Sequence, residues 1–391
     1  MVAQTRIYSF DFLRSIAMLL GLAVHAPLIF YFPEAASEFA IEDIEPAENW
    51  IWLMLDFITV WRMPIFFLLS GFFSVLLINK IGLKSYTLDR FIRIGLTCLF
   101  FSALFDILDG NFDLTLNHLW FLYYLFIFII GFSFLYLFSS FQNIISKKLT
   151  FRGWTIILLL VTMIGQLSIL INGSLSPLMF YPPETYLDLN FGALVYYFPF
   201  YLVGTLLYSN QQLFQVLDTR KFVIVSGLLS VFFFSLFLYA NDLMYEINKY
   251  DLDLTQNGVA VFKHTKFNPM IVILHNCLKQ INTITWIIFL IAISTRYIRS
   301  NNSTLKWFVE LSYPVYILHL APVTIISAEL YILGFNQISI FILSMLIGFF
   351  IAVMLYYTTI KFTPISWLVN GYRKSFFKIR YLNDGKDTLN Q

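Results

Sequence analysis

Runs of about 20 mostly apolar residues recur along this chain, with short polar breaks between them. A helix needs about that many apolar residues to cross a bilayer. The runs are continuous, whereas the strands of a membrane barrel alternate over about 10 residues, so helices are predicted. The expected spans lie near 13–32, 52–78, 91–108, 118–138, 155–172, 192–209, 222–240, 280–298, 312–332 and 338–360.

The scarcity of charge excludes most other classes of protein. Only 12% of the 391 residues are charged, whereas a soluble domain carries about 25%. The net charge of +2 is far from the balance of a nucleic-acid binder. A soluble enzyme and a disordered protein are also disfavoured. We therefore predict an all-α polytopic membrane protein, a bundle of about ten transmembrane helices.

The basic residues predict how this bundle is oriented, because Lys and Arg collect in cytoplasmic loops. One side of the ten-span topology holds both termini and 20 of the 25 basic residues. Both termini are therefore expected in the cytoplasm, with residues 1–365 forming the membrane domain and 366–391 a basic tail. The stretch 256–278 is interfacial, re-entrant or part of a span. Its apolar part, Met270–Leu274, is expected to extend the eighth helix or lie at the interface.

Two ionisable residues of the first helix share one face. Arg14 and His25 are 11 positions apart, which places them within about 20° of each other and about 16 Å apart along the axis. Asp11 can pair with Arg14 on that face. Ionisable groups inside a membrane helix are costly and usually functional. His25 is therefore a candidate for chemistry, with a helix-packing histidine as the equal alternative.

The second helix carries Arg62 near its middle, and this guanidinium cannot easily lose its charge. It needs a carboxylate, a cluster of carbonyls or an anionic ligand. Asp56 is the nearest acid in sequence, but it lies about 120° away round the helix. Further along, Ser70 and Gly71 permit close approach of a substrate or another helix, and small-residue packing is the simpler explanation.

Weaker signals follow in the third, fourth and ninth helices. Arg90 and Arg93, at i and i+3, could hold phosphates, although positive-inside anchoring is the simpler alternative. The other polar or aromatic candidates in these helices are His118, Trp120, Tyr316 and His319. The two cysteines, Cys98 and Cys277, lie far apart and show no metal-ligand spacing, so no metal site is expected.

Taken in order, these motifs resemble the membrane acyltransferase-3 family. The resemblance covers nearly the whole chain and implies ten helices. It is carried by Arg14-x10-His25, Phe66-Phe67-Leu68-Leu69-Ser70-Gly71, Arg90-x-x-Arg93, His118 to Leu122 and Tyr313 to His319. Within the family, the chain is most similar to the branch that succinylates osmoregulated periplasmic glucans. That similarity is carried by Met18-Leu19-Leu20-Gly21, Arg62-Met63-Pro64 and His118 to Leu122.

The resemblance implies an O-acyltransferase of the bacterial inner (plasma) membrane. It would move a succinyl or acetyl group from cytoplasmic acyl-CoA, its co-substrate, to a hydroxyl of a periplasmic or cell-surface glycan. No bound cofactor and no nucleic-acid partner are expected.

The resemblance also implies roles for single residues. His25 is the expected general base, Arg14 a second catalytic residue, and Arg90 and Arg93 the acyl-CoA ligands. We further hypothesise that Arg62 binds the distal carboxylate of a succinyl donor. The residues expected to bind substrate or support the site are Asp11, Arg62, Ser70, His118, Trp120, Tyr316 and His319.

The alternative is a membrane transporter or export component for a glycan or a small anion. Arg62 and Pro64 fit a carrier with intramembrane charge and broken helices. Carriers with internal repeats tend to have matching Gly/Pro-interrupted segments in their two halves. The sequence shows no such pair, which favours the enzyme.

Overall fold

The computed structural model describes the chain except for residues 1–7, 111–112, 173–182, 184, 249–250, 255–259, 264–268, 301–302, 373–374 and 378–391. Helices dominate the described part, as predicted. They are α1 (Tyr8–His25), α2 (Leu28–Tyr31), α3 (Pro33–Ser37), α4 (Asn49–Ile81), α5 (Leu83–Arg90), α6 (Thr97–Leu108), α7 (Trp120–Leu135), α8 (Ser139–Ser146), α9 (Phe151–Asn172), α10 (Phe191–Ser209), α11 (Leu213–Leu217), α12 (Arg220–Asn248), α13 (Pro269–Tyr297), α14 (Ser303–Leu318), α15 (Leu320–Ile332), α16 (Gln337–Leu355) and α17 (Ser366–Val369).

The described chain also contains three helical elements of other types and one hairpin. The segments Phe91–Leu96 and Tyr356–Ile360 are π-helical, and Asn117–Leu119 is a 3-10 turn. Strands β1 (Asp251–Leu254) and β2 (Ala260–Lys263) pair in antiparallel fashion. The all-α prediction is confirmed for the fold, and this short hairpin lies in the connection between α12 and α13. Its first strand alternates Asp and Leu, the period of a strand.

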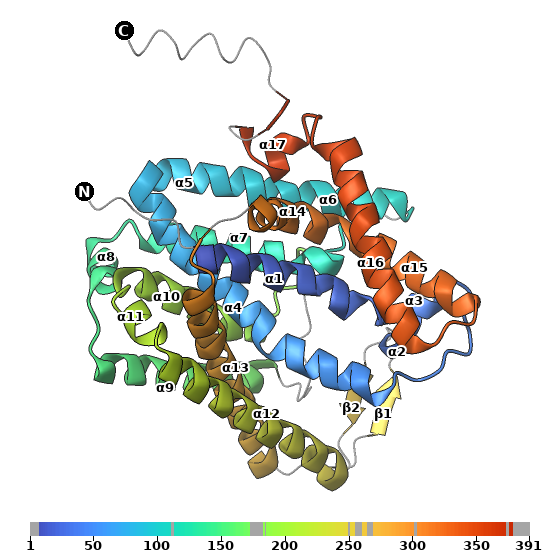
Figure 1. The fold of residues 1–391 in the computed structure, drawn as a ribbon, viewed down its shortest axis with the longest axis horizontal. Coiled ribbons are helices and arrows are strands. Elements are labelled where there is room, and N and C mark those ends of the chain that lie inside the picture. Colours follow the sequence, from blue (N-terminus) through green and yellow to red (C-terminus); the bar gives the residue numbers. More distant parts are fainter. Residues whose placement is uncertain are drawn as a thin grey trace.

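Eight helical segments within the described residues are long and apolar enough to cross a membrane, and α14 with α15 makes a ninth if the bent pair is one span. Helix α1 falls outside that set, yet it lies in the middle of the bundle (Figure 1). Each of the ten predicted regions therefore corresponds to a helix or a bent helix pair. Met270–Leu274 extends the eighth of these helices, as predicted, because α13 begins at Pro269.

Two predicted spans are not continuous helices. The span 13–32 ends at His25, and Pro27 separates α1 from α2 because proline has no backbone N–H to donate. The span 312–332 is bent by 69° between Leu318 and Leu320. Both breaks occur at or beside a histidine, which places these side chains at helix ends inside the bundle.

Helices α4 and α10 cross at two glycines. A Cβ atom on Gly71 would lie 1.9 Å from the carbonyl oxygen of Tyr201, and one on Gly204 would lie 1.8 Å from that of Leu68. The two backbones are therefore in direct contact, as small residues permit between membrane helices. The small-residue explanation of the Ser70-Gly71 motif is confirmed for Gly71.

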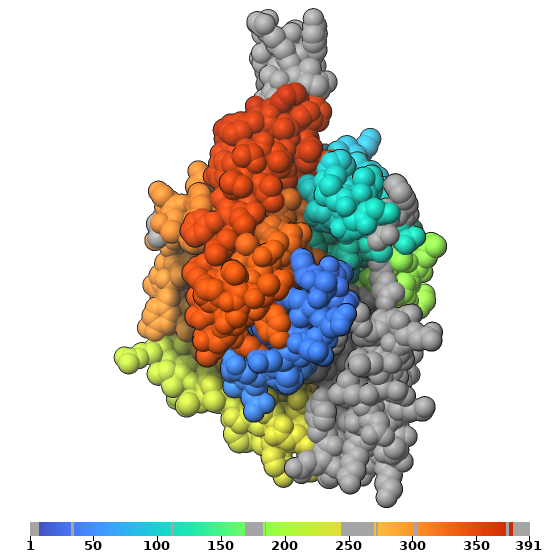
Figure 2. Space-filling model, turned by 90° about the vertical axis from the view of Figure 1, so that its right-hand side faces the viewer, coloured from blue at the N-terminus to red at the C-terminus, as the bar shows by residue number. Residues whose placement is uncertain are grey.

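The chain between α3 and α4 is fixed to the C-terminal helices. The backbone N–H of Glu48 donates to Gln337 Oε1 at 2.9 Å, and Gln337 Nε2 donates to the carbonyl of Pro46 at 2.9 Å. Figure 2 views this end of the molecule and shows the blue segment beside the orange and red α15 and α16. The N- and C-terminal parts of the chain thus close the bundle around α1.

The glycine crossing gives a direct test of this packing. We expect Gly71→Ala and Gly204→Ala each to destabilise the protein by about 1–3 kcal/mol or more, because an added methyl overpacks a backbone contact. Thermal unfolding of the detergent-purified protein measures this. Gly131→Ala in α7 is the matched control, since nothing lies within 4 Å of its Cβ position. Equal melting temperatures for all three variants would contradict the crossing.

Candidate active site

Three histidines from distant parts of the chain meet inside the bundle. His25 ends α1, His118 lies in the 3-10 turn before α7, and His319 lies at the bend between α14 and α15. The ring centroid of His319 is 5.3 Å from that of His25 and 5.3 Å from that of His118, and the His25 and His118 centroids are 6.4 Å apart. We call these three residues the histidine cluster.

Backbone carbonyls determine which nitrogen carries the proton in two of these rings. His319 Nδ1 lies 2.7 Å from the carbonyl oxygen of Tyr316, and His118 Nε2 lies 3.0 Å from that of Ile317. A ring nitrogen that faces a carbonyl must donate, so the other nitrogen of a neutral ring is an acceptor. His319 Nε2, His118 Nδ1 and His25 Nδ1 have no hydrogen-bond partner among the described residues. The cluster can therefore accept a proton from a bound molecule.

Arg62 of α4 places a positive charge beside these rings. Its Nε donates to the carbonyl of Ala17 at 2.8 Å. A Cβ atom on Gly21 would lie 2.9 Å from Arg62 Nη2 and 3.0 Å from His319 Nε2, so the missing side chain of Gly21 makes room for both. Arg62 forms no ion pair with a carboxylate in the part of the chain that the structure describes. This buried cation can therefore stabilise an anion that forms or binds here.

Three tyrosines lie within electrostatic range of the Arg62 guanidinium: Tyr31, Tyr197 and Tyr316. Tyr316, a predicted site residue, donates from its hydroxyl to the carbonyl of His118 at 2.5 Å and so holds the turn that carries that histidine. Trp120 packs against Tyr197, with 6.0 Å between ring centroids, and lies behind it. No sequence signal marks Tyr31 and Tyr197 as site residues, because tyrosines are common in membrane helices.

Three arginines gather at the other end of α1. Arg14 pairs with Asp11 at 3.6 Å, as predicted. Arg93 lies within electrostatic range of both Arg90 and Arg14. Its Nη2 donates to the carbonyl of Val369 at 3.4 Å, and Arg90 pairs with Asp89 at 3.1 Å. The predicted CoA-binding arginines and Arg14 thus form one cationic end, about 16 Å along α1 from His25.

Two predicted site residues therefore lie away from the histidine cluster. Arg62, and not Arg14, is the guanidinium beside the histidine cluster, because its Nη2 lies next to His319 Nε2 at Gly21. Arg14 lies about 16 Å from His25 along α1. Ser70 lies eight residues beyond Arg62, about 12 Å along α4. It is next to the α4–α10 crossing, and its carbonyl accepts from Ser74 Oγ.

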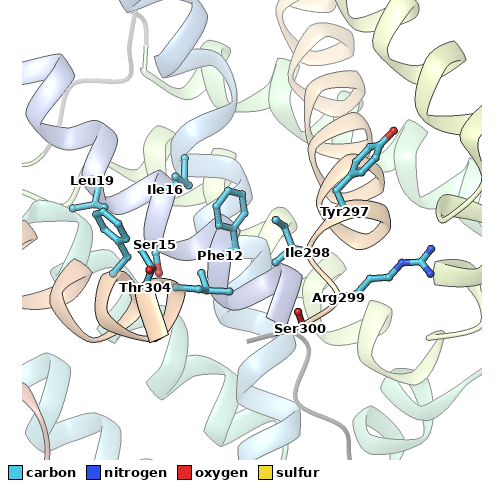
Figure 3. A pocket seen from close by; sticks show the side chains of 11 residues that line it. Phe12, Ser15, Ile16, Leu19, Tyr297, Ile298, Arg299, Ser300 and Thr304 are labelled. Carbon is cyan, nitrogen blue, oxygen red and sulfur yellow. The ribbon is translucent and has the colours of Figure 1, made fainter. Parts of the chain in front are cut away.

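A cavity of about 420 Å³ lies on the face of α1 opposite Gly21 (Figure 3). It is bounded by α1, the end of α13 and the start of α14. On an ideal helix, Phe12 and Leu19 point about 180° and 160° away from Gly21, so the cavity is separate from the histidine cluster. Its lining residues are Phe12, Ser15, Ile16, Leu19, Tyr297, Ile298, Arg299, Ser300, Thr304, Leu305 and Phe308.

Among the described residues, no group of three or more His, Cys, Asp or Glu side chains is arranged to hold a metal ion.

Comparison with known proteins identifies the family of the chain. The family model described as an acyltransferase domain, that of acyltransferase-3, matches residues 7–357. The chain belongs to the acyltransferase-3 family. It is therefore an acyltransferase and, with its apolar helices, a multi-pass membrane protein, as the motifs indicate. No solved structure matches the chain.

Curated relatives match a smaller part of the chain. Glucans biosynthesis protein C of Escherichia coli O1:K1 is 35% identical over 98 residues, which are 25% of this chain and 24% of that protein. The protein of the same name from Escherichia coli O139:H28 matches equally. The chain thus matches about a quarter of the length of these relatives.

Gly21 allows the site geometry to be tested without removing any reactive group. We expect Gly21→Ala to lower acyl transfer at least about tenfold, because its methyl would displace Arg62 and His319, and a 1 Å misplacement costs up to about 10²-fold. Acyl transfer by the purified protein is the measurement, and Gly131→Ala is the control. Full activity of Gly21→Ala would show that the Arg62–His319 contact is not needed.

Proposed function

We propose that the protein transfers an acyl group, succinyl or acetyl, from acyl-CoA on the cytoplasmic side to a hydroxyl of a periplasmic or cell-surface glycan. The observation that carries this proposal is the histidine cluster beside the buried guanidinium of Arg62, opposite the three clustered arginines. Base, oxyanion-binding group and phosphate-binding end thus lie along one path beside α1.

The cationic end suits the acyl-CoA donor. Arg90 and Arg93 can hold its phosphates, because charge-assisted hydrogen bonds from guanidinium groups to phosphate are strong. The positive-inside rule assigns this end to the cytoplasm, where acyl-CoA is found. The acyl group then extends along α1 past Arg14 toward Gly21 and the histidine cluster. Asp11 keeps Arg14 oriented at this entrance.

The histidine cluster suits the transfer step. His25 takes the proton of the acceptor hydroxyl, since an imidazole is suited to proton transfer near neutral pH. The acceptor oxygen attacks the thioester carbonyl, and Arg62 stabilises the oxyanion that forms. When the carbon–sulfur bond breaks, the CoA thiolate leaves and takes the proton from the His25 imidazolium. Ester and CoA are the products, and no proton is released.

The name of the E. coli relatives supports a glucan as the acceptor. The resemblance of the motifs to the succinylating branch supports succinyl as the group transferred. We propose the inner membrane of a bacterium as the location of the enzyme, between a cytoplasmic donor and an external acceptor.

Removing the base tests the proposal. We expect His25→Ala to lose at least about 10²-fold in acyl transfer, the contribution of general acid–base catalysis. The protein should still insert in the membrane and purify as wild type. Ester content of the glycan from a complemented deletion strain is the measurement. Normal ester content would contradict the role of His25, and accumulation of internal glycan would favour the transporter.

The role of Arg62 is tested with two donors. As the oxyanion-binding group, Arg62→Leu should lower transfer from succinyl-CoA and from acetyl-CoA equally, by about 10²–10³-fold. Steady-state rates with each donor measure this. A loss confined to succinyl-CoA would instead assign Arg62 to the distal carboxylate of the succinyl group, the hypothesis drawn from the sequence.

A further inference from the structure

A second polar cluster lies inside the bundle, apart from the histidine cluster. His275 and Asn282 of α13 are 1% and 0% exposed and lie seven positions apart, within about 20° of each other round the helix. Asp56 of α4 and Lys279 of α13 attract each other across the helix pair. Asn241 of α12 lies one helical turn from Phe237, whose ring packs against His275. We call the following residues the outer polar cluster: Asp56, Asn241, His275, Lys279 and Asn282.

Four polar atoms of this cluster have no hydrogen-bond partner among the described residues. They are Asn241 Oδ1, His275 Nε2 and both amide atoms of Asn282. Polar residues that only join membrane helices are expected to be paired. Thr283 is such a residue, since its hydroxyl donates to the carbonyl of Val60 at 2.9 Å. Leaving several buried groups unpaired is costly, so the cluster calls for a binding partner.

The mixture of unpaired atoms indicates the chemistry of that partner. An anion would satisfy only the donors and a cation only the acceptors, whereas a hydroxyl both donates and accepts. Aromatic rings lie beside the polar groups. The ring centroids of Trp286 and Phe57 are 4.9 Å apart, and those of Phe237 and His275 are 5.3 Å apart. Trp286 Nε1 also has no partner among the described residues. Hydroxyls beside apolar C–H faces are the chemistry of a sugar ring.

The outer polar cluster is connected to the histidine cluster through α4 and α10. The hydroxyl of Tyr196 hydrogen-bonds to Gln280 and Thr283. The next residue, Tyr197, interacts electrostatically with Arg62. Thr283 also contacts Val60, two residues before Arg62. From His275 to Asn282 the cluster extends about 10 Å along α13, enough for more than one sugar ring.

We propose that the outer polar cluster binds sugar units of the acceptor glycan adjoining the one that is acylated. This inference rests on the proposed function and names the place where its acceptor is held. The cluster is closed in this structure, so binding requires the α12–α13 pair to move away from α4. A buried cluster of polar and ionisable groups could also conduct protons, but the transfer reaction releases no proton.

The test uses the full chain purified in detergent, acyl-CoA, and a β-linked glucose oligosaccharide as the acceptor probe. Asn282→Leu keeps the branched shape and the number of side-chain heavy atoms, and it replaces both unpaired atoms by methyl groups. We expect it to raise the KM for the oligosaccharide about tenfold to hundredfold, with kcat and the KM for acyl-CoA within about threefold of wild type. Ser294→Ala is the control on the same helix, because its hydroxyl already bonds to the carbonyl of Leu290.

A second measurement does not depend on turnover. The oligosaccharide should raise the melting temperature of wild type and of Ser294→Ala, but not that of Asn282→Leu. If Asn282→Leu does not purify as a folded protein, Asn241→Leu on α12 takes its place. An unchanged acceptor KM and an equal thermal shift in the variant would overturn the proposal and leave water as the partner. A wild type that is stabilised by the sugar but transfers no acyl group would refute the proposed function alone.

Discussion

The charge of Arg62 is the constraint around which this bundle is arranged. A guanidinium in the middle of a membrane helix is costly and cannot be neutralised by losing a proton. The structure compensates it partly, through the carbonyl of Ala17 and the surrounding tyrosines. No carboxylate among the described residues completes the pair. The uncompensated part of this positive charge lies beside the histidine cluster. Arg62 thus brings α1, α4 and the bend at His319 together at one point.

Both ends of α1 depend on this arrangement. At one end Arg14 lies with Arg90 and Arg93, and at the other His25 lies against His319. Between them Gly21 leaves the space in which Arg62 and His319 come together. A single helix thus joins a region suited to phosphates to a region suited to proton transfer. In the proposed function, this arrangement lets a donor and an acceptor on opposite sides of the bilayer reach the same atoms.

Much of the architecture could be predicted from apolar runs and charge alone. The ten helical regions and the pairing of Asp11 with Arg14 follow from local spacing, which helix geometry makes reliable. The breaks were harder to predict. A run such as 312–332 is apolar throughout, so nothing in its hydropathy indicates the 69° bend at His319. The β1–β2 hairpin lies in a polar connection where no membrane pattern applies.

The sequence by itself determined that this is a helical membrane protein, which of its residues are ionisable inside the helices, and its family. These properties depend on composition and on spacing within one helix. Only the tertiary structure decided that His25, His118 and His319 share one site, that Arg62 rather than Arg14 is their neighbour, and that Asp56 faces Lys279. Such contacts depend on how separate helices cross. Within a bilayer those crossings are set by close backbone contacts such as that of Gly71 with Tyr201. The sequence around Gly71 does not identify Tyr201 as its partner.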